Sequence, residues 1–198
     1  MSAGQPCRLW IPGARPSTWA RSAPHPGRTR LGRRAATAQP RTTFSAGLPT
    51  VRALATEGGG YAEAGLKQAI NTGIIPGPRL LISSKAIVAT GSYAPSRTSY
   101  AYDTPLGAEE ADGPELVHAI RDQIGHGADW VKLYGDYRWG PNGEAMPTFS
   151  ADEMRTAAAT ATSQGRESGG HAATPERGML AIAAGRRTMA RGTRRTPG

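Results

Sequence analysis

Residues 129–134 read Asp-Trp-Val-Lys-Leu-Tyr, and residues 135–141, which follow, read Gly-Asp-Tyr-Arg-Trp-Gly-Pro. The first run has the apolar, aromatic and β-branched composition of a short buried strand. Lys132 stands in the middle of this run, and burying an ammonium group costs free energy unless the group is paired or neutralised. The pattern therefore predicts a strand whose lone lysine has a specific purpose. A polar and aromatic loop is predicted at the carboxyl end of that strand.

The size and composition of the chain limit its architecture. It has 198 residues, of which 38% are hydrophobic, and a single cysteine, Cys7. This length suffices for one domain with a core, but the low apolar content predicts that part of the chain stays outside it. One cysteine excludes an internal disulfide and a cysteine-rich zinc site. No apolar run approaches the roughly 20 residues of a membrane span. No secretory signal is recognisable either, which favours the cytoplasm.

The net charge of +9 is unevenly distributed along the chain. Residues 1–56 contain nine Arg and no acid, and residues 177–198 contain six Arg and no acid. Between them, residues 57–176 contain three Lys and six Arg against fifteen acids. This distribution, with the many prolines near the start, predicts a disordered Arg/Pro-rich segment over 1–40 and a disordered basic tail over 186–198. The folded domain is predicted over 41–185.

The basic ends have three competing explanations. They could bind nucleic acid, with Trp10 and Trp19 stacking on bases. A mitochondrial-type transit peptide is disfavoured, because the prolines break the amphipathic helix that it needs. Out-of-frame translation of GC-rich DNA would give the same residue types and the same abrupt change in composition. The sequence leaves these explanations open.

The middle of the chain alternates between strand and helix patterns. Strands are predicted at 48–54, 79–83, 130–134 and 165–171, and helices at 61–71, 151–163 and 175–184. A further helix is predicted with Pro114 at its first position and with its end at Gly125 or Gly127. Residues 150–153 form a capping box, and residues 89–107 form a long polar connection. Alternation of this kind predicts an α/β fold in which crossover helices join a parallel sheet. The functional groups of such folds gather at the carboxyl ends of the strands.

Four stretches, taken in their order along the chain, resemble one known family. They are Gly73-Ile-Ile-Pro-Gly-Pro-Arg-Leu80, Ile124-Gly-His-Gly-Ala-Asp-Trp-Val-Lys-Leu-Tyr134, Tyr137-Arg-Trp-Gly-Pro-Asn-Gly143 and His171-Ala-Ala-Thr-Pro-Glu176. Together they resemble the imidazolonepropionase-like branch of the metal-dependent amidohydrolase superfamily, which includes dipeptidases of the Xaa-Pro or prolidase type. The resemblance covers about residues 41–185.

The resemblance implies a fold and a chemistry. The fold would be a partial (β/α)8 TIM-type barrel of about four βα units. Lys132 would be carbamylated, a reaction that needs a neutral amine, and His171 would be the second recognisable ligand of a divalent metal, expected to be zinc. Water activated by the metal would then hydrolyse the C–N bond of a small amide or dipeptide. Tyr134, Tyr137 and Arg138, which follow the lysine at the exit of its strand, have two open interpretations: they hold a carboxylate of the substrate, or they form a packed loop.

The chain also departs from the family pattern. The family's His-x-His pair has no counterpart, because the histidines are His25, His118, His126 and His171 alone. We expect His118 to face solvent from a helix and His126 to occupy a turn. No catalytic residue can be assigned, and the chain resembles an internal fragment with an incomplete metal site. A non-catalytic partner that completes a barrel with another chain is a further alternative.

Overall fold

The computed structural model describes residues 40–56, 60–93, 108–171 and 188–191. At His171 and over 188–191 the description is of the backbone. The predicted helix at 175–184 and nearly all of the predicted Arg/Pro-rich segment lie outside these ranges. The first described residues, 40–45, form a short helical segment.

A small two-stranded unit begins the fold. Strand β1 (Thr50–Arg52) pairs in parallel with β2 (Arg79–Leu81), and helix α2 (Ala62–Asn71) connects them. Buried Val51 and Leu80 form a small core against which Leu66 and Ile70 of the helix pack. The helix repeats apolar residues at helical spacing, as the sequence predicts.

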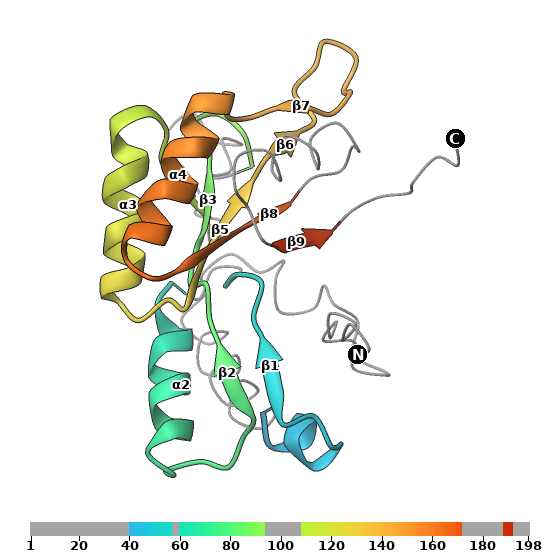
Figure 1. Ribbon diagram of the computed structural model, residues 1–198. Helices are drawn as coiled ribbons and strands as arrows, with labels where there is room; N and C mark the ends of the chain where they lie inside the picture. Colours follow the sequence, from blue (N-terminus) through green and yellow to red (C-terminus); the bar gives the residue numbers. More distant parts are fainter. Residues whose placement is uncertain (1–39, 57–59, 94–107, 172–187, 192–198) are drawn as a thin grey trace, which may run out of the picture.

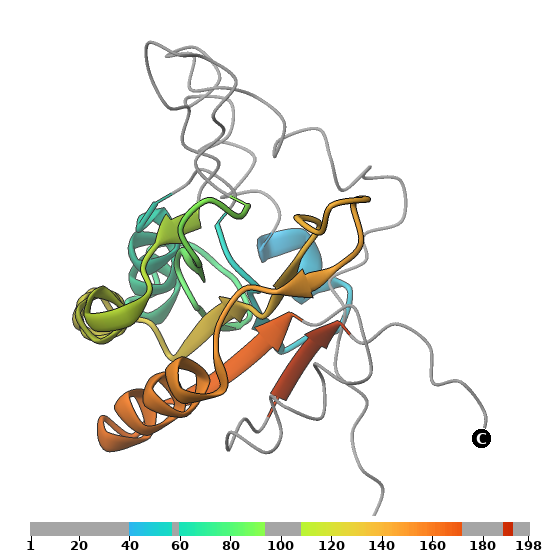
Figure 2. The same ribbon diagram turned by 90° about the horizontal axis from the view of Figure 1, so that it is seen from above.

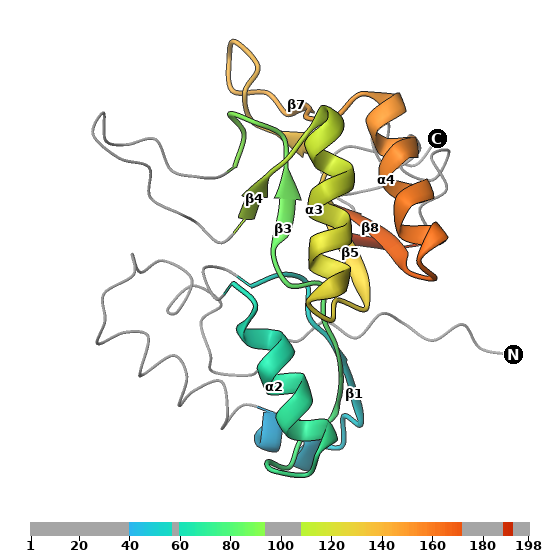
Figure 3. The same cartoon turned by 90° about the vertical axis from the view of Figure 1, so that its left-hand side faces the viewer.

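Five parallel strands form the main sheet. Their spatial order is β4-β3-β5-β8-β9, with β3 at Ala86–Val88, β4 at Ala108–Glu110, β5 at Trp130–Tyr134, β8 at Glu167–His171 and β9 at Thr188–Arg191. Helices α3 (Gly113–Gly125) and α4 (Ala151–Ser163) lie along one side of this sheet (Figures 1 and 2). Figure 3 shows the two helices side by side, with α2 continuing the helical layer below them.

The main core lies between the sheet and these two helices. Val131 and Leu133 of β5 are fully buried there. They pack in one cluster with Leu116 and Ile120 of α3 and with Ala157 of α4. Because side chains alternate along a strand, the residues between and beside them belong to the opposite face of the sheet. The helix packing therefore fixes which face of β5 bears Lys132.

Asp129 joins the two-stranded unit to the main sheet. Its backbone N–H donates to the carbonyl of Ile82 over 2.8 Å, and its side chain accepts from the N–H of Ile82 over 2.9 Å. The same carboxylate pairs with Lys67 of α2 at 2.6 Å. One residue before β5 thus connects a strand and a helix of the neighbouring unit.

The structure corrects two strand predictions. The segment at 48–54 is a strand only over 50–52. The strand predicted at 79–83 ends at Leu81, and the chain resumes as β3 after a break that includes Ser83 and Ser84. The break includes Ser84, whose φ of 59° is left-handed and lies outside the range of regular strand backbone. The predicted strands include neither β3 nor β4, although β3 is the apolar and fully buried run Ala-Ile-Val.

The loop predicted after the lysine strand is partly a hairpin. Strand β6 (Asp136–Tyr137) pairs antiparallel with β7 (Met146–Pro147).

Strand β9 also departs from prediction, because it lies within the segment 186–198 for which the sequence predicts a disordered tail. Three of those four residues, Thr188, Met189 and Arg191, pair with β8. Backbone pairing can order polar and basic residues that hydrophobic patterning does not identify.

The helix boundaries agree closely with the sequence. The capping box at Ser150 and Glu153 is present in full. Asp112 is the N-cap of α3, although Pro114 takes the second rather than the first helical position.

The predicted parallel α/β arrangement is confirmed, whereas the described strands form no closed barrel. Among the described residues, no helix is long and apolar enough to cross a membrane.

Candidate functional site

Lys132 lies in the middle of β5 with only 2% of its surface exposed. Its neighbours on the strand, Val131 and Leu133, are fully buried in the main core. The ammonium group lies 5.4 Å from the centre of the Tyr134 ring, within reach of a cation–π interaction. The prediction of a buried strand lysine is thus confirmed.

His171 ends the strand next to the lysine strand. Strand β8 runs parallel to β5, with Gly169 beside Lys132 and His171 beside Tyr134. Gly169, which is buried, adds no side chain of its own beside the lysine. The backbone register therefore brings Lys132 and His171 to adjacent strands, separated by two residues along the strand direction. Sequence alone predicts Lys132 in the middle of one strand and His171 at the end of another, but not this register.

The three residues predicted to hold a substrate carboxylate lie at the carboxyl end of β5. Tyr134 is the last residue of the strand, half-buried, with its ring edge-to-face with Tyr93 at 5.2 Å. Tyr137 is half-buried in β6, and Arg138 is exposed just beyond it. Tyr134 shares the Lys132 face of the sheet, whereas Tyr137 and Arg138 belong to the hairpin. The structure brings these residues to the same end of the sheet as the end of β8.

A complete metal site is not formed by the described residues. No group of three or more His, Cys, Asp or Glu side chains in those ranges could hold a metal ion. Lys132 and His171 are the two ligands that the resemblance implies, and structural zinc usually has four ligands and catalytic zinc three. The residues at hand therefore fit part of a metal site, and we assign no catalytic step to a metal here.

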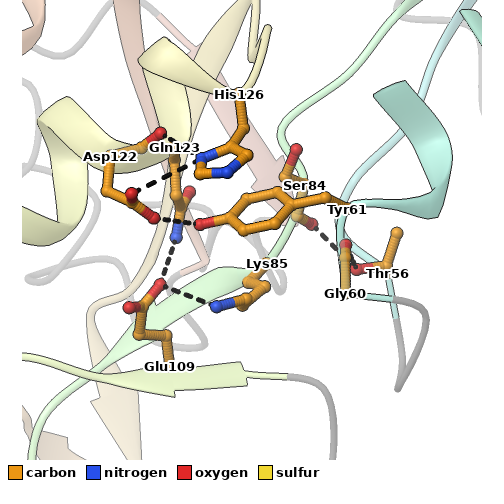
Figure 4. Close-up of polar contacts among 9 residues, drawn as sticks. All are labelled: Thr56, Gly60, Tyr61, Ser84, Lys85, Glu109, Asp122, Gln123 and His126. Atoms are coloured by element: carbon orange, nitrogen blue, oxygen red, sulfur yellow. Dashed lines mark hydrogen bonds and ion pairs between the residues drawn. The ribbon is translucent and has the colours of Figure 1, made fainter. Parts of the chain in front are cut away.

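A second polar cluster lies where α2 begins and α3 ends (Figure 4). The Tyr61 hydroxyl donates to Asp122, and the Tyr61 ring stacks on His126 with centroids 3.9 Å apart. Lys85 lies 4.7 Å from the centre of the same ring and 3.5 Å from Glu109. Burial raises the pKa of Tyr61, and the hydrogen bond to Asp122 raises it further. This cluster joins two helices and contains no arrangement of a nucleophile and a base.

His118 and His126 lie where the sequence predicts them. His118 is exposed on α3, and His126 caps the carboxyl end of that helix. The Nδ1–H of His126 donates to the Asp122 carbonyl over 2.9 Å. It lies at the start of the connection to β5, at the amino end of the strands. It is therefore remote from the strand ends where Lys132 and His171 gather.

Comparison with known proteins gives structural matches only. No protein-family model matches the sequence, and no curated protein matches it. A solved structure of an amidohydrolase superposes with a TM-score of 0.66 at 30% identity, over 80% of this chain and 41% of that one. This chain's structural relatives are amidohydrolases, prolidases and Xaa-Pro dipeptidases. The family resemblance predicted from the sequence is confirmed at this level.

Two further relatives with stated activities have the same extent of similarity. A Xaa-Pro dipeptidase with methionine bound in its active site matches with a TM-score of 0.66 at 25% identity, over 85% of this chain and 42% of that one. The ochratoxinase of A. niger matches with a TM-score of 0.63 at 28% identity, over 83% and 40%. The chain thus spans about two fifths of the length of these amidohydrolase-type structures.

Proposed function

We propose that the chain forms part of an amidohydrolase-type hydrolase that acts on a C–N bond of the amide or peptide type. The observation that supports this proposal most strongly is a buried lysine on β5 beside the strand that ends in His171. This pair occurs in a fold that the chain shares with amidohydrolases and Xaa-Pro dipeptidases. Arginine-rich nucleic-acid binding gains no support from those relatives.

Lys132 and His171 have complementary parts in this proposal. The neutral amine of Lys132 would add to carbon dioxide and release a proton to solvent, which creates a carboxylate on a long arm. That carboxylate and the His171 imidazole suit a divalent ion such as zinc. When bound, such an ion supplies a Lewis acid and an activated water. The burial of Lys132 supports this role, because burial favours the neutral amine.

The proposed substrate-binding residues are Tyr134, Tyr137 and Arg138. The guanidinium group of arginine matches a carboxylate in shape and charge, and tyrosine hydroxyls can donate to the same group. We propose that they hold the carboxylate of a small dipeptide or acylated amino acid. Their position at the carboxyl end of β5 supports this assignment, because parallel sheets bind ligands at that edge.

Metal titration tests the lysine–histidine pair directly. The full chain is incubated with bicarbonate and Zn²⁺, and the zinc affinity is measured by competition with a chelating dye. We expect Lys132→Ala and His171→Ala each to weaken zinc binding by roughly tenfold or more. Lys85→Ala and His118→Ala are the matched controls and should leave the affinity unchanged. Equal zinc affinity in all five proteins would rule out this metal site.

Hydrolysis is measured separately on the zinc-loaded chain. A panel of Xaa-Pro dipeptides and N-acetyl amino acids provides amide bonds of the proposed class. Turnover that disappears in Lys132→Ala but persists in Lys85→Ala would support the hydrolase. Zinc bound at Lys132 and His171 without turnover of any panel member would reject catalysis by this chain while retaining the metal site.

A further inference from the structure

Residues 136–147 form a folded arm rather than an open loop. Its two sides are the short strands β6 and β7, which pair with each other beyond the carboxyl end of β5 (Figure 1). At its root, the Thr148 N–H donates to the carbonyl of Gly135 over 3.2 Å, and the Thr148 hydroxyl donates to the carbonyl of Tyr134. The root of the arm is therefore fastened to the last residue of the lysine strand.

A tight turn, Gly140-Pro141-Asn142-Gly143, closes the tip of this arm. The Gly143 N–H donates to the carbonyl of Gly140 over 2.8 Å, which is the hydrogen bond of a four-residue turn. Gly143 has a φ of 78°, a left-handed conformation that glycine adopts without strain. The Asn142 N–H donates to the carboxylate of Glu144 over 2.9 Å. The peptide bond between Asn142 and Gly143 is thus held in a closed turn.

An asparagine followed by a glycine can lose its side-chain amide without an enzyme. The backbone nitrogen of the glycine attacks the side-chain carbonyl carbon of the asparagine and closes a succinimide ring. The proton of that nitrogen passes through solvent to the amide nitrogen, which leaves as ammonia. Water then opens the ring and leaves aspartate or isoaspartate. Glycine favours ring closure, because it has a flexible backbone and no side chain that obstructs the attack.

The sequence contains one other asparagine, Asn71, which provides an internal comparison. Asn71 and Asn142 are both exposed, and the N–H that follows each of them is hydrogen-bonded. The Thr72 N–H donates to the carbonyl of Gln68 over 2.9 Å at the end of helix α2. Thr72 is β-branched, so its side chain and its stiffer backbone obstruct the attack that Gly143 permits. Asn142 is therefore the asparagine suited to ring closure.

The closed arm opposes this reaction. The Gly143 N–H must leave the Gly140 carbonyl before its nitrogen can attack the side chain of Asn142. The arm has strands of only two residues each, and a hairpin of that size opens locally at a low free energy. The rate of deamidation should therefore follow the population of the open arm.

We propose that Asn142 is a site of spontaneous deamidation, that the closed arm slows this reaction, and that the product keeps the arm from closing again. Aspartate at this position places a second carboxylate near that of Glu144, and like charges repel each other. Isoaspartate adds a methylene group to the backbone, which the hydrogen bonds of the turn do not accommodate. The proposal concerns the stability of the arm over time and does not depend on the proposed hydrolase.

Timed incubation of the full chain at mildly alkaline pH tests the site. Protease digestion and mass spectrometry then quantify aspartate and isoaspartate at residues 142 and 71 separately. We expect residue 142 to react roughly tenfold or more faster than residue 71. Residue 142 should react faster still in urea, after correction with a synthetic peptide of residues 138–145 in the same solvents. Equal rates at the two residues overturn the proposal, and a corrected rate that urea does not raise overturns the role of the closed arm.

Substitutions test how the arm controls the rate. Glu144→Ala removes the acceptor of the Asn142 N–H and should accelerate deamidation roughly three- to tenfold, the population shift that one net hydrogen bond implies. Thr148→Val removes the hydroxyl bond at the root and should act in the same direction. Glu115→Ala, at an exposed position on α3, is the matched control and should leave the rate unchanged. Slower deamidation in Glu144→Ala would show that the carboxylate assists the reaction as a base, which contradicts the proposal.

Hydrogen exchange tests the effect of the product on the arm. Asn142→Asp should accelerate amide exchange at Gly143, whereas the amides of α4 serve as an unchanged reference. Asn142→Gln adds no charge and is the control for the loss of asparagine itself. Exchange at Gly143 that is the same in both variants would reject the claim that the new carboxylate opens the arm.

Discussion

Ser84 occupies an unfavourable backbone conformation in the interior. Its φ of 59° is left-handed, its surface is fully buried, and its hydroxyl has no hydrogen-bond partner among the described residues. The surroundings hold it there, because its carbonyl accepts from both the N–H and the hydroxyl of Thr56, over 2.8 and 3.3 Å (Figure 4). The break between β2 and β3 thus depends on a strained residue.

Ser84→Gly should stabilise the protein. Glycine removes the left-handed strain of about 1 to 2 kcal/mol and the buried hydroxyl, against an entropic cost of about 0.5 to 1 kcal/mol, for a net gain of about 1 kcal/mol. Urea unfolding of the full chain measures the change. Ser83→Gly is the matched control, since Ser83 is also buried with an unpartnered hydroxyl but lacks a positive φ. An equal gain in both variants would contradict the explanation by strain.

Glu63, in the first turn of α2, is a buried carboxyl with an altered ionisation. Burial raises the pKa of Glu63 from 4.5 to about 7, although a hydrogen bond from the Ser84 backbone opposes this shift. Its Oε2 atom has no hydrogen-bond partner within the described residues. The native state therefore binds more protons than the unfolded chain between these two pKa values, and stability falls as the pH rises through that window.

Glu63→Gln should remove this pH dependence. The amide is neutral at every pH, so the variant should exceed the unsubstituted chain in stability by about 3 kcal/mol at about pH 8 and differ little at about pH 4.5. Urea midpoints measured across this pH range provide the comparison. Glu115→Gln, at an exposed position early in α3, is the control. A gain of the same size at both ends of the range would show that ionisation of Glu63 is not the cause.

At the scale of elements, helix α2 contains a glycine at a position that has room for a larger side chain. Gly65 lies inside the helix, and a Cβ there would meet nothing within 4 Å. Gly77, in the turn before β2, is different, because a Cβ there would lie 2.8 Å from Cδ1 of Ile70. Gly65 therefore lowers the helix propensity of α2 with no packing contact that requires a glycine. Gly77 permits close packing between the helix and the turn.

The two glycines should therefore respond to alanine in opposite ways. Gly65→Ala should raise the free energy of unfolding by about 0.5 to 1 kcal/mol, the usual difference in helix propensity. Gly77→Ala should lower it by about 1 to 3 kcal/mol through overpacking against Ile70. Thermal and urea unfolding with circular dichroism compares both variants with the unsubstituted chain. Stabilisation by Gly77→Ala would show that the turn relaxes at little cost.

At the scale of the whole molecule, Asp129 connects the two parallel sheets. Its carboxylate serves both Lys67 of α2 and the backbone N–H of Ile82, 47 residues earlier in the chain. The hydrogen bond from the Ile82 N–H to the Asp129 carboxylate satisfies a backbone donor, which would lose this partner if the carboxylate were removed. The side chain thus stabilises the junction through two elements at once.

Asp129→Ala should destabilise the protein by about 2 kcal/mol, because a backbone donor and an ammonium group both lose a charged partner. Asp152→Ala is the control, since its ion pair with Arg155 on α4 is largely exposed and should matter little. Hydrogen exchange locates the effect, which we expect at Ile82 and along β2. Equal losses of stability in both variants would contradict a linking role for Asp129.

Much of the architecture follows from local sequence patterns. The apolar run around Lys132, the helical spacing in α2 and the capping box of α4 each depend on residues close together in the chain. The alternation of these patterns was enough to predict a parallel α/β fold and a buried lysine. It was also enough to place His126 in a turn, because Gly127 and the strand that follows limit the end of α3.

Other features depend on contacts between residues far apart in sequence, and only the tertiary structure decided them. The break after β2 is held by Thr56 and Asp129, which no local pattern around Ser84 reveals. The arm 136–147 looks like a loop until the Thr148 and Glu144 hydrogen bonds are known. The adjacency of Lys132 and His171 arises from the register of β8 on β5. Register is set by the packing of a whole sheet against its helices, so the sequence determined the candidate residues and the tertiary structure decided which of them lie on neighbouring strands.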